Sequence, residues 1–144
     1  EMCIRDRATY TPVATDIGKT LTVTVTATKA GFITTSKTSA VTFAVAAESF
    51  VTTPDPTLSG TTTVNSTLTA GTTGWDPSAG VTFTYVWKQS STSGGTGTVI
   101  SGASLSTYKL LATDLGKFIT VTVTAAKTGY ISVTKTSLPT TVIR

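Results

Sequence analysis

Several residue types that carry chemistry are scarce or missing in this chain of 144 residues. It has no histidine and one cysteine, Cys3, so it lacks the imidazole and thiolate sets that hold zinc, and no disulfide can close within it. No uncharged apolar run is long enough for a transmembrane helix, and the N-terminus lacks the residue order of a signal peptide. The chain as given is therefore expected neither to span a membrane nor to direct its own export.

Charge is also sparse, at 12% of residues, with a formal net charge of +4. Surfaces that bind nucleic acid usually gather cations on one face, with aromatic or base-reading groups between them. Here the basic residues beyond position 7 are spread along the chain, which predicts solvated surface and no nucleic-acid partner: Lys19, Lys29, Lys37, Lys88, Lys109, Lys117, Lys127, Lys135 and Arg144.

Threonine, by contrast, is abundant, with 37 copies, and Thr, Val, Ile and Tyr all favour pleated, half-buried strands. From Ile119 to Thr124 apolar residues and threonines alternate, which is typical of a strand with one buried face. The stretch from Val81 to Trp87 alternates in the same way, and Leu68 and Ala70 share a face. Because no helical periodicity appears, the sequence predicts an all-β protein with an antiparallel β-sandwich.

A segment near the start of the chain returns at its end. Residues 8–46 align with residues 106–144 without a gap at an offset of 98, and 20 of these 39 positions are identical. A spacing near 100 residues is too long for a solenoid unit and suits independent sandwich domains in a row. We expect a complete module over residues 53–144, a linker at 47–52, and over residues 8–46 the last part of a truncated copy.

The complete module is expected to hold seven strands, near residues 57–61, 64–70, 81–89, 98–100, 106–111, 117–125 and 130–142. Pro54 and Pro56 are expected to stiffen the join between the copies. The truncated copy has apolar residues but no facing sheet to cover them, so it is predicted to be poorly stable alone: Tyr10, Ile17, Leu21, Val23, Val25 and Phe32.

Residues 1–7, EMCIRDR, differ from the rest of the chain. They hold the only cysteine, the only methionine and the densest cluster of charge, and they match nothing at the equivalent place in the second copy. They resemble translated adapter or assembly-junction sequence, so we leave them out of the fold and expect the natural protein to continue upstream. The alternative is a reactive surface thiol at Cys3.

The order of segments TLSGTTTVNSTLTA, GWDPSAGVTFTYVWK and TDLGKFITVTVTAAKTGY resembles the Ig-like repeats found in tandem in large secreted and cell-wall proteins of actinobacteria and related bacteria. The resemblance covers residues 53–144, and its last part again covers residues 8–46. It implies an immunoglobulin-like sandwich, an extracellular or cell-wall location, and neighbouring Ig-like repeats as partners.

Single positions can be compared with the wider immunoglobulin fold. Trp87 resembles the core tryptophan of the third strand, and Ala70 and Thr120 stand where antibody domains place their two cysteines. Residues 114–118, DLGKF, resemble the corner that leads into the sixth strand, with Phe118 in place of the usual tyrosine. The resemblance therefore implies that both the disulfide and the tyrosine hydroxyl bond of that corner are missing.

No catalytic, cofactor or metal site is expected. Without histidine, hydrolysis would need paired carboxylates or a Ser–Lys arrangement. Asp55, Asp76 and Asp114 fall in expected turns, where Asp commonly bonds nearby backbone groups. The same three carboxylates would be the donors of a calcium site at a module junction, although no D-x-D or EF-type spacing is present.

Two features leave a binding role open. Trp75 would stack on a sugar ring if it were exposed, and the favoured alternative is that it plugs the open end of the sandwich. The loop Ser90–Gly97 is rich in glycine but lacks the Gly-Lys-Ser/Thr ending of a phosphate cradle, so a flexible hairpin loop is predicted.

The leading hypothesis is a non-enzymatic spacer or stalk module of a bacterial extracellular protein. One alternative is an adhesion module that binds a cell-surface glycan or protein through Trp75 and the loop. The other is an accessory repeat of a secreted polysaccharide-degrading enzyme.

Overall fold

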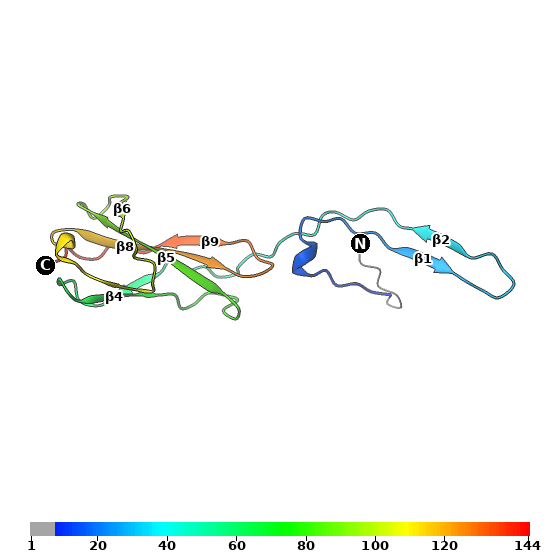
Figure 1. The fold of residues 1–144 in the computed structure, drawn as a ribbon, viewed down its shortest axis with the longest axis horizontal. Coiled ribbons are helices and arrows are strands. Elements are labelled where there is room, and N and C mark those ends of the chain that lie inside the picture. Colours follow the sequence, from blue (N-terminus) through cyan, green and yellow to red (C-terminus); the bar gives the residue numbers. More distant parts are fainter. Residues whose placement is uncertain (1–7) are drawn as a thin grey trace. The chain divides into compact units, whose positions relative to one another are not determined.

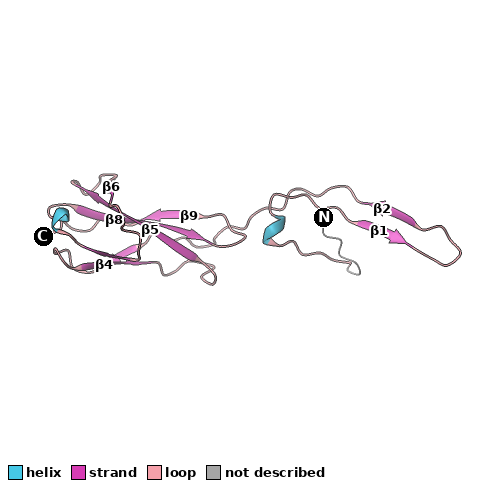
Figure 2. Ribbon diagram, viewed as in Figure 1, coloured by secondary structure: helices cyan, strands magenta, loops and turns pink. Residues whose placement is uncertain are grey.

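The computed structural model describes residues 8–144, so the expectations for residues 1–7, including Cys3, lie outside the described residues. The chain divides into two compact units between Glu48 and Ser49, which we call the first and second units. The described residues form strands, loops and two short 3-10 turns without an α-helix, which confirms an all-β fold (Figure 2). In this part of the chain no helix is long and apolar enough to span a membrane.

The second unit contains two antiparallel sheets (Figure 1). One has the order β3-β4-β7, formed by Thr57–Ser59, Thr67–Gly71 and Thr107–Lys109. The other has the order β6-β5-β8-β9, formed by Thr98–Val99, Thr82–Ser90, Phe118–Ala126 and Val133–Thr136. All seven lie within the strand regions expected from the sequence, or one residue beyond them, and most are shorter.

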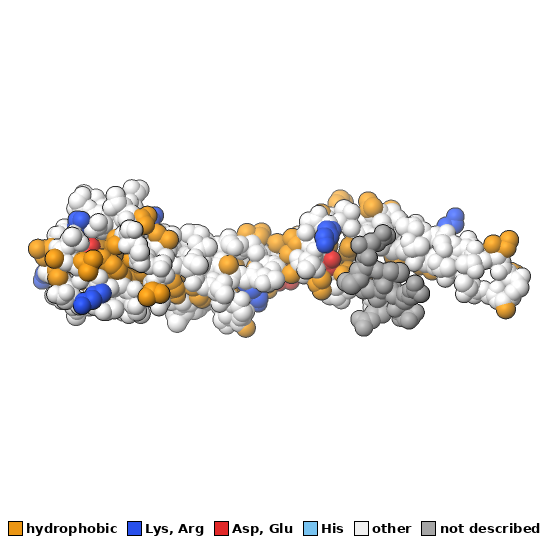
Figure 3. Space-filling model, viewed as in Figure 1, with side chains coloured by type: hydrophobic (Ala, Val, Ile, Leu, Met, Phe, Trp, Pro, Cys, Tyr) orange, Lys and Arg blue, Asp and Glu red, His pale blue; other side chains and the backbone are white. Residues whose placement is uncertain are grey.

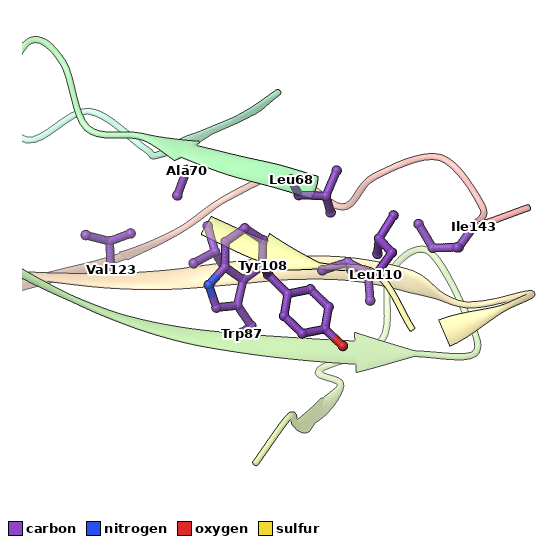
Figure 4. Packing of buried hydrophobic residues seen from close by; sticks show 9 residues of the cluster. Leu68, Ala70, Trp87, Tyr108, Leu110, Val123 and Ile143 are labelled. Atoms are coloured by element: carbon purple, nitrogen blue, oxygen red, sulfur yellow. The ribbon is translucent and has the colours of Figure 1, made fainter. Parts of the chain in front are cut away.

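A single apolar cluster joins the two sheets. Leu68 and Ala70 of β4 lie on one side and Trp87 and Val123 on the other, with Trp87 and Val123 fully buried (Figure 4). The alternation predicted for β8 is confirmed, because Ile119, Val121 and Val123 are all buried while the threonines between them are partly exposed. The packing of two antiparallel sheets around one core is compatible with a β-sandwich.

Thr120 does not face the core, although its comparison with an antibody cysteine implies a core-facing side chain. Thr120 pairs with Lys88 in the sheet and lies between Ile119 and Val121, both of which are buried. Side chains on a strand alternate between faces, so Thr120 belongs to the outer face, away from the core that contains Ala70.

The last expected strand, 130–142, is also shorter than predicted. Regular pairing in β9 stops at Thr136, after which the Ser137 and Thr140 hydroxyls accept the N–H groups of Val121 and Ile119 at 3.0 Å each. Side-chain oxygens thus take the place of backbone carbonyls in the ladder, and Pro139 between them has no N–H to donate.

The linker expected at residues 47–52 differs as well, since residues 49–52 lie in the second unit. Phe50 is buried against Trp75, and Thr52 forms an antiparallel bridge with Asp76. No alternating pattern in the sequence predicts these two contacts, because neither of them belongs to a regular strand.

The first unit is built from a 3-10 turn, η1 (Ala14–Asp16), and one hairpin of β1 (Thr24–Ala27) and β2 (Thr35–Thr38). Thr24 and Thr38 bond through their hydroxyls at 2.7 Å, as Thr122 and Thr136 do in the second unit at 3.0 Å. None of residues 8–48 is buried. The local structure of the repeat is therefore present in the first unit without a core.

Candidate functional site

The most distinctive polar group in the second unit is Asp114, which is 1% exposed. It ends the 3-10 turn η2 (Ala112–Asp114), and its Oδ2 accepts the phenol O–H of Tyr108 and the backbone N–H of Leu111, each at 2.8 Å. Burial, with the hydrogen bond to the carboxylate as a second cause, raises the pKa of Tyr108 well above its ordinary value. The pair is occupied in holding β7 to the turn before β8.

This pair was missed at the sequence level. The corner does lack a tyrosine at Phe118, but Tyr108, from β7, supplies a hydroxyl bond to the same turn. Asp114 does accept a local backbone N–H, as its turn position predicts. The available signal was the spacing of six residues from Tyr to Asp, which recurs as Tyr10 and Asp16.

The first unit repeats this arrangement at its surface. The phenol O–H of Tyr10 and the N–H of Val13 both donate to Oδ2 of Asp16. The hydrogen bond from Tyr10 is the main cause, and the one from Val13 the second cause, that lowers the pKa of Asp16. The hydrogen bond between Tyr10 and Asp16 is also the main cause that raises the pKa of Tyr10. Tyr10 is 42% exposed, compared with 8% for Tyr108.

Trp75 is buried, with 4% of its surface exposed. Its ring meets Phe50 edge-on at 5.4 Å between centroids and Phe83 at 5.7 Å, and Phe50 in turn lies 5.4 Å from Tyr130. The ring therefore fills a second, aromatic cluster, and no face is left for a sugar to stack upon. This is the plugging arrangement that the sequence analysis favoured.

The loop Ser90–Gly97 borders a shallow polar groove of about 350 Å³. Gln89, Ser90 and Thr98 line it together with Lys117, whose ammonium group donates to Oε1 of Gln89 at 2.8 Å. The groove offers one cation and several hydroxyls, which suits weak hydrogen bonding, and the ammonium group of that cation is engaged with Gln89.

The three aspartates considered for calcium have separate tasks. Asp55 pairs with Lys135 at 3.5 Å, the backbone of Asp76 bonds that of Thr52, and Asp114 holds Tyr108. Among residues 8–144 no three acidic, His or Cys side chains are grouped as metal ligands would be. Over the same residues every buried side-chain polar atom has a hydrogen-bond partner. Lys and Arg side chains visible in Figure 3 are scattered over the surface.

No protein-family model, curated protein or solved structure matches this chain.

Proposed function

We propose that the second unit is a non-enzymatic spacer module, of immunoglobulin-like type, in a bacterial extracellular or cell-surface protein. The observation that carries the proposal is the position of its two ends. Phe50, at the entry, packs with Ala125 near the end of β8, whereas Ile143, at the exit, bonds Lys117 just before β8 begins. The chain thus enters and leaves at opposite ends of a strand of nine residues, which spans about 27 Å.

A spacer also needs a surface that stays soluble without attracting ligands. The outer face of β8 carries threonines, and two of them, Thr122 and Thr124, bond threonines of β9 at 3.0 and 2.9 Å. The aromatic and acidic side chains that could recognise a ligand, Trp75 and Asp114, are buried in packing contacts. Such a module contributes length and stiffness, and neighbouring Ig-like repeats in the same chain are its partners.

The end-to-end arrangement can be tested by a distance measurement in the full chain. Spin labels would be placed on Val51→Cys and Arg144→Cys in a Cys3→Ser background, since Val51 is 81% exposed and Arg144 is exposed. A narrow distribution at or above about 27 Å is expected. A distance below about 15 Å would place the ends together and refute the spacer role.

The adhesion alternative now depends on the loop groove alone, because the exposed Trp75 that it required is buried. Calorimetric titration with soluble glycans tests it. Saturable binding that is lost in Lys117→Ala and kept in Lys135→Ala would favour adhesion over a passive spacer. The accessory-repeat alternative calls for a catalytic domain in the parent protein.

A further inference from the structure

The first unit presents an apolar face that its counterpart in the second unit keeps buried. Val23 is 59% exposed and Val25 is 64% exposed. At the offset of 98 residues they correspond to Val121 and Val123, which are both 0% exposed. Since the sequences of the two strands are identical from Thr22 to Ala27, the difference lies in what covers them.

The second unit shows what that cover is. Trp87 and Tyr85 of β5 stand in register with Val121 and Val123, and Leu68 and Ala70 of β4 belong to the same core cluster. These four residues all come from 49–105, and Tyr108 and Leu110, from the β7 region, complete the cluster on the facing side. In the first unit, the described sheet has the order β1-β2, so β1 lacks on its other edge the strand that β5 provides for β8. The same few residues therefore present both an apolar face and an unpaired strand edge.

The hairpin of the first unit already makes the hydrogen bonds that its counterpart makes in the second unit. The hydroxyls of Ser39 and Thr42 accept the N–H groups of Val23 and Leu21 at 3.1 and 3.0 Å, as Ser137 and Thr140 do for Val121 and Ile119. Val45 accepts the N–H of Gly18 at 2.8 Å, as Ile143 does for Gly116 at 2.9 Å. A preformed surface loses less conformational freedom on binding, which favours association.

We propose that the first unit is an acceptor for strand complementation. Its face at Val23 and Val25 and the open edge of β1 bind a polypeptide segment with the residue pattern of 49–105. The segment adds a strand beside β1 and sets an aromatic side chain equivalent to Trp87 next to Val23, as Trp87 lies next to Val121. The occupant is a further segment of this pattern, because residues 49–105 of this chain, and of any second copy, already form the core of their own second unit.

Amide hydrogen exchange in the full chain tests the proposal. It is measured at residues 23–27 of the first unit, so that any binding of the added segment to the second unit does not affect the result. One arm adds a synthetic segment of residues 49–105, and the other fuses that segment directly ahead of Ala8, which reproduces the continuous order 105–106 of the second unit. In either arm exchange at these amides is expected to slow at least about tenfold.

Two variants on neighbouring positions of β1 provide the control. Val25→Lys places a charge on the apolar face and is expected to abolish the slowing. Thr24→Lys changes the opposite face, equivalent to the outward Thr122, and is expected to retain it. Unchanged exchange in both arms, or slowing that survives Val25→Lys, would overturn the proposal. Protection that rises with chain concentration without added segment would overturn it in favour of self-association.

Discussion

The phenol oxygen of Tyr108 lies 2.8 Å from Oδ2 of Asp114, and both side chains are buried. One comes from β7 and the other from the turn before β8, so the bond joins the two sheets that enclose the core. A hydrogen bond to an ionised group is stronger than one between neutral groups, and breaking one side leaves a buried partner unsatisfied. The pair is therefore expected to contribute strongly to the stability of the packing between the two sheets.

Replacing Asp114 by Ala is expected to lower the free energy of unfolding of the second unit by about 2–5 kcal/mol. The change removes the acceptor of both Tyr108 and the N–H of Leu111. Urea denaturation of the full chain, followed by the fluorescence of Trp75 and Trp87, which are both buried in the second unit, measures it. Asp16→Ala alters the equivalent position of the first unit and should leave this transition unchanged. Equal effects of the two variants would show that Asp114 has no special role.

The raised pKa of Tyr108 makes the second unit sensitive to alkaline pH. A raised pKa means that folding favours the protonated phenol, so the stabilisation is complete below the unfolded pKa of about 10 and is lost as the pH rises through the folded value. Unfolding free energies measured from pH 8 to 11.5 should fall above about pH 10. Tyr108→Phe should be less stable at pH 8 and show a smaller decline, and parallel curves for the two proteins would contradict this.

Phe50 is expected to be part of the second unit energetically as well as spatially. Phe50→Ala removes a ring packed against Trp75 and Tyr130, which should cost about 3–5 kcal/mol of unfolding free energy. Val51→Ala, at a neighbouring side chain that is 81% exposed, should cost less than about 0.5 kcal/mol. Thermal unfolding of both variants measures these changes. If Phe50→Ala left the free energy of unfolding unchanged, residues 49–52 would act as a linker and not as part of the second unit.

Gly60 and Gly102 both have positive φ, at 123° and 78°, but only one is also confined. A Cβ on Gly60 would lie 2.4 Å from the carbonyl oxygen of Thr67, whereas one on Gly102 would meet nothing within 4 Å. Gly102→Ala should cost about 1–2 kcal/mol for the backbone conformation alone, and Gly60→Ala more than that because β3 must also shift from β4. If chemical denaturation gave the two variants similar losses of unfolding free energy, the close contact with Thr67 would not contribute to the cost of Gly60→Ala.

Sequence reasoning located the core strands because their burial is periodic. Ile119, Val121 and Val123 of β8 repeat every second residue, and a period of two indicates which face of the strand is buried. It misplaced Thr120 because the comparison with antibody cysteines was made by position along the chain, while the register of β8 assigns the odd-numbered residues to the core.

Features that depend on single tertiary contacts could not be predicted in the same way. The burial of Phe50 arises from one contact with Trp75, and the strand break at Ser137 arises from a hydroxyl that accepts a backbone N–H. Neither leaves a repeating pattern in the sequence. The link between Tyr108 and Asp114 was visible only as a spacing shared by the two copies, and its meaning needed the fold.

The opposite placement of the entry and the exit has a mechanical consequence. Arg144, the exit residue, donates its N–H to Thr62 and accepts that of Val64, each at 2.8 Å, in the pattern of parallel strands. Tension applied at Ser49 and Arg144 draws these two segments along each other, so both hydrogen bonds bear the load at the same time. The second unit should resist stretching by shear at this patch, and its failure under tension should begin there rather than at the loop Ser90–Gly97.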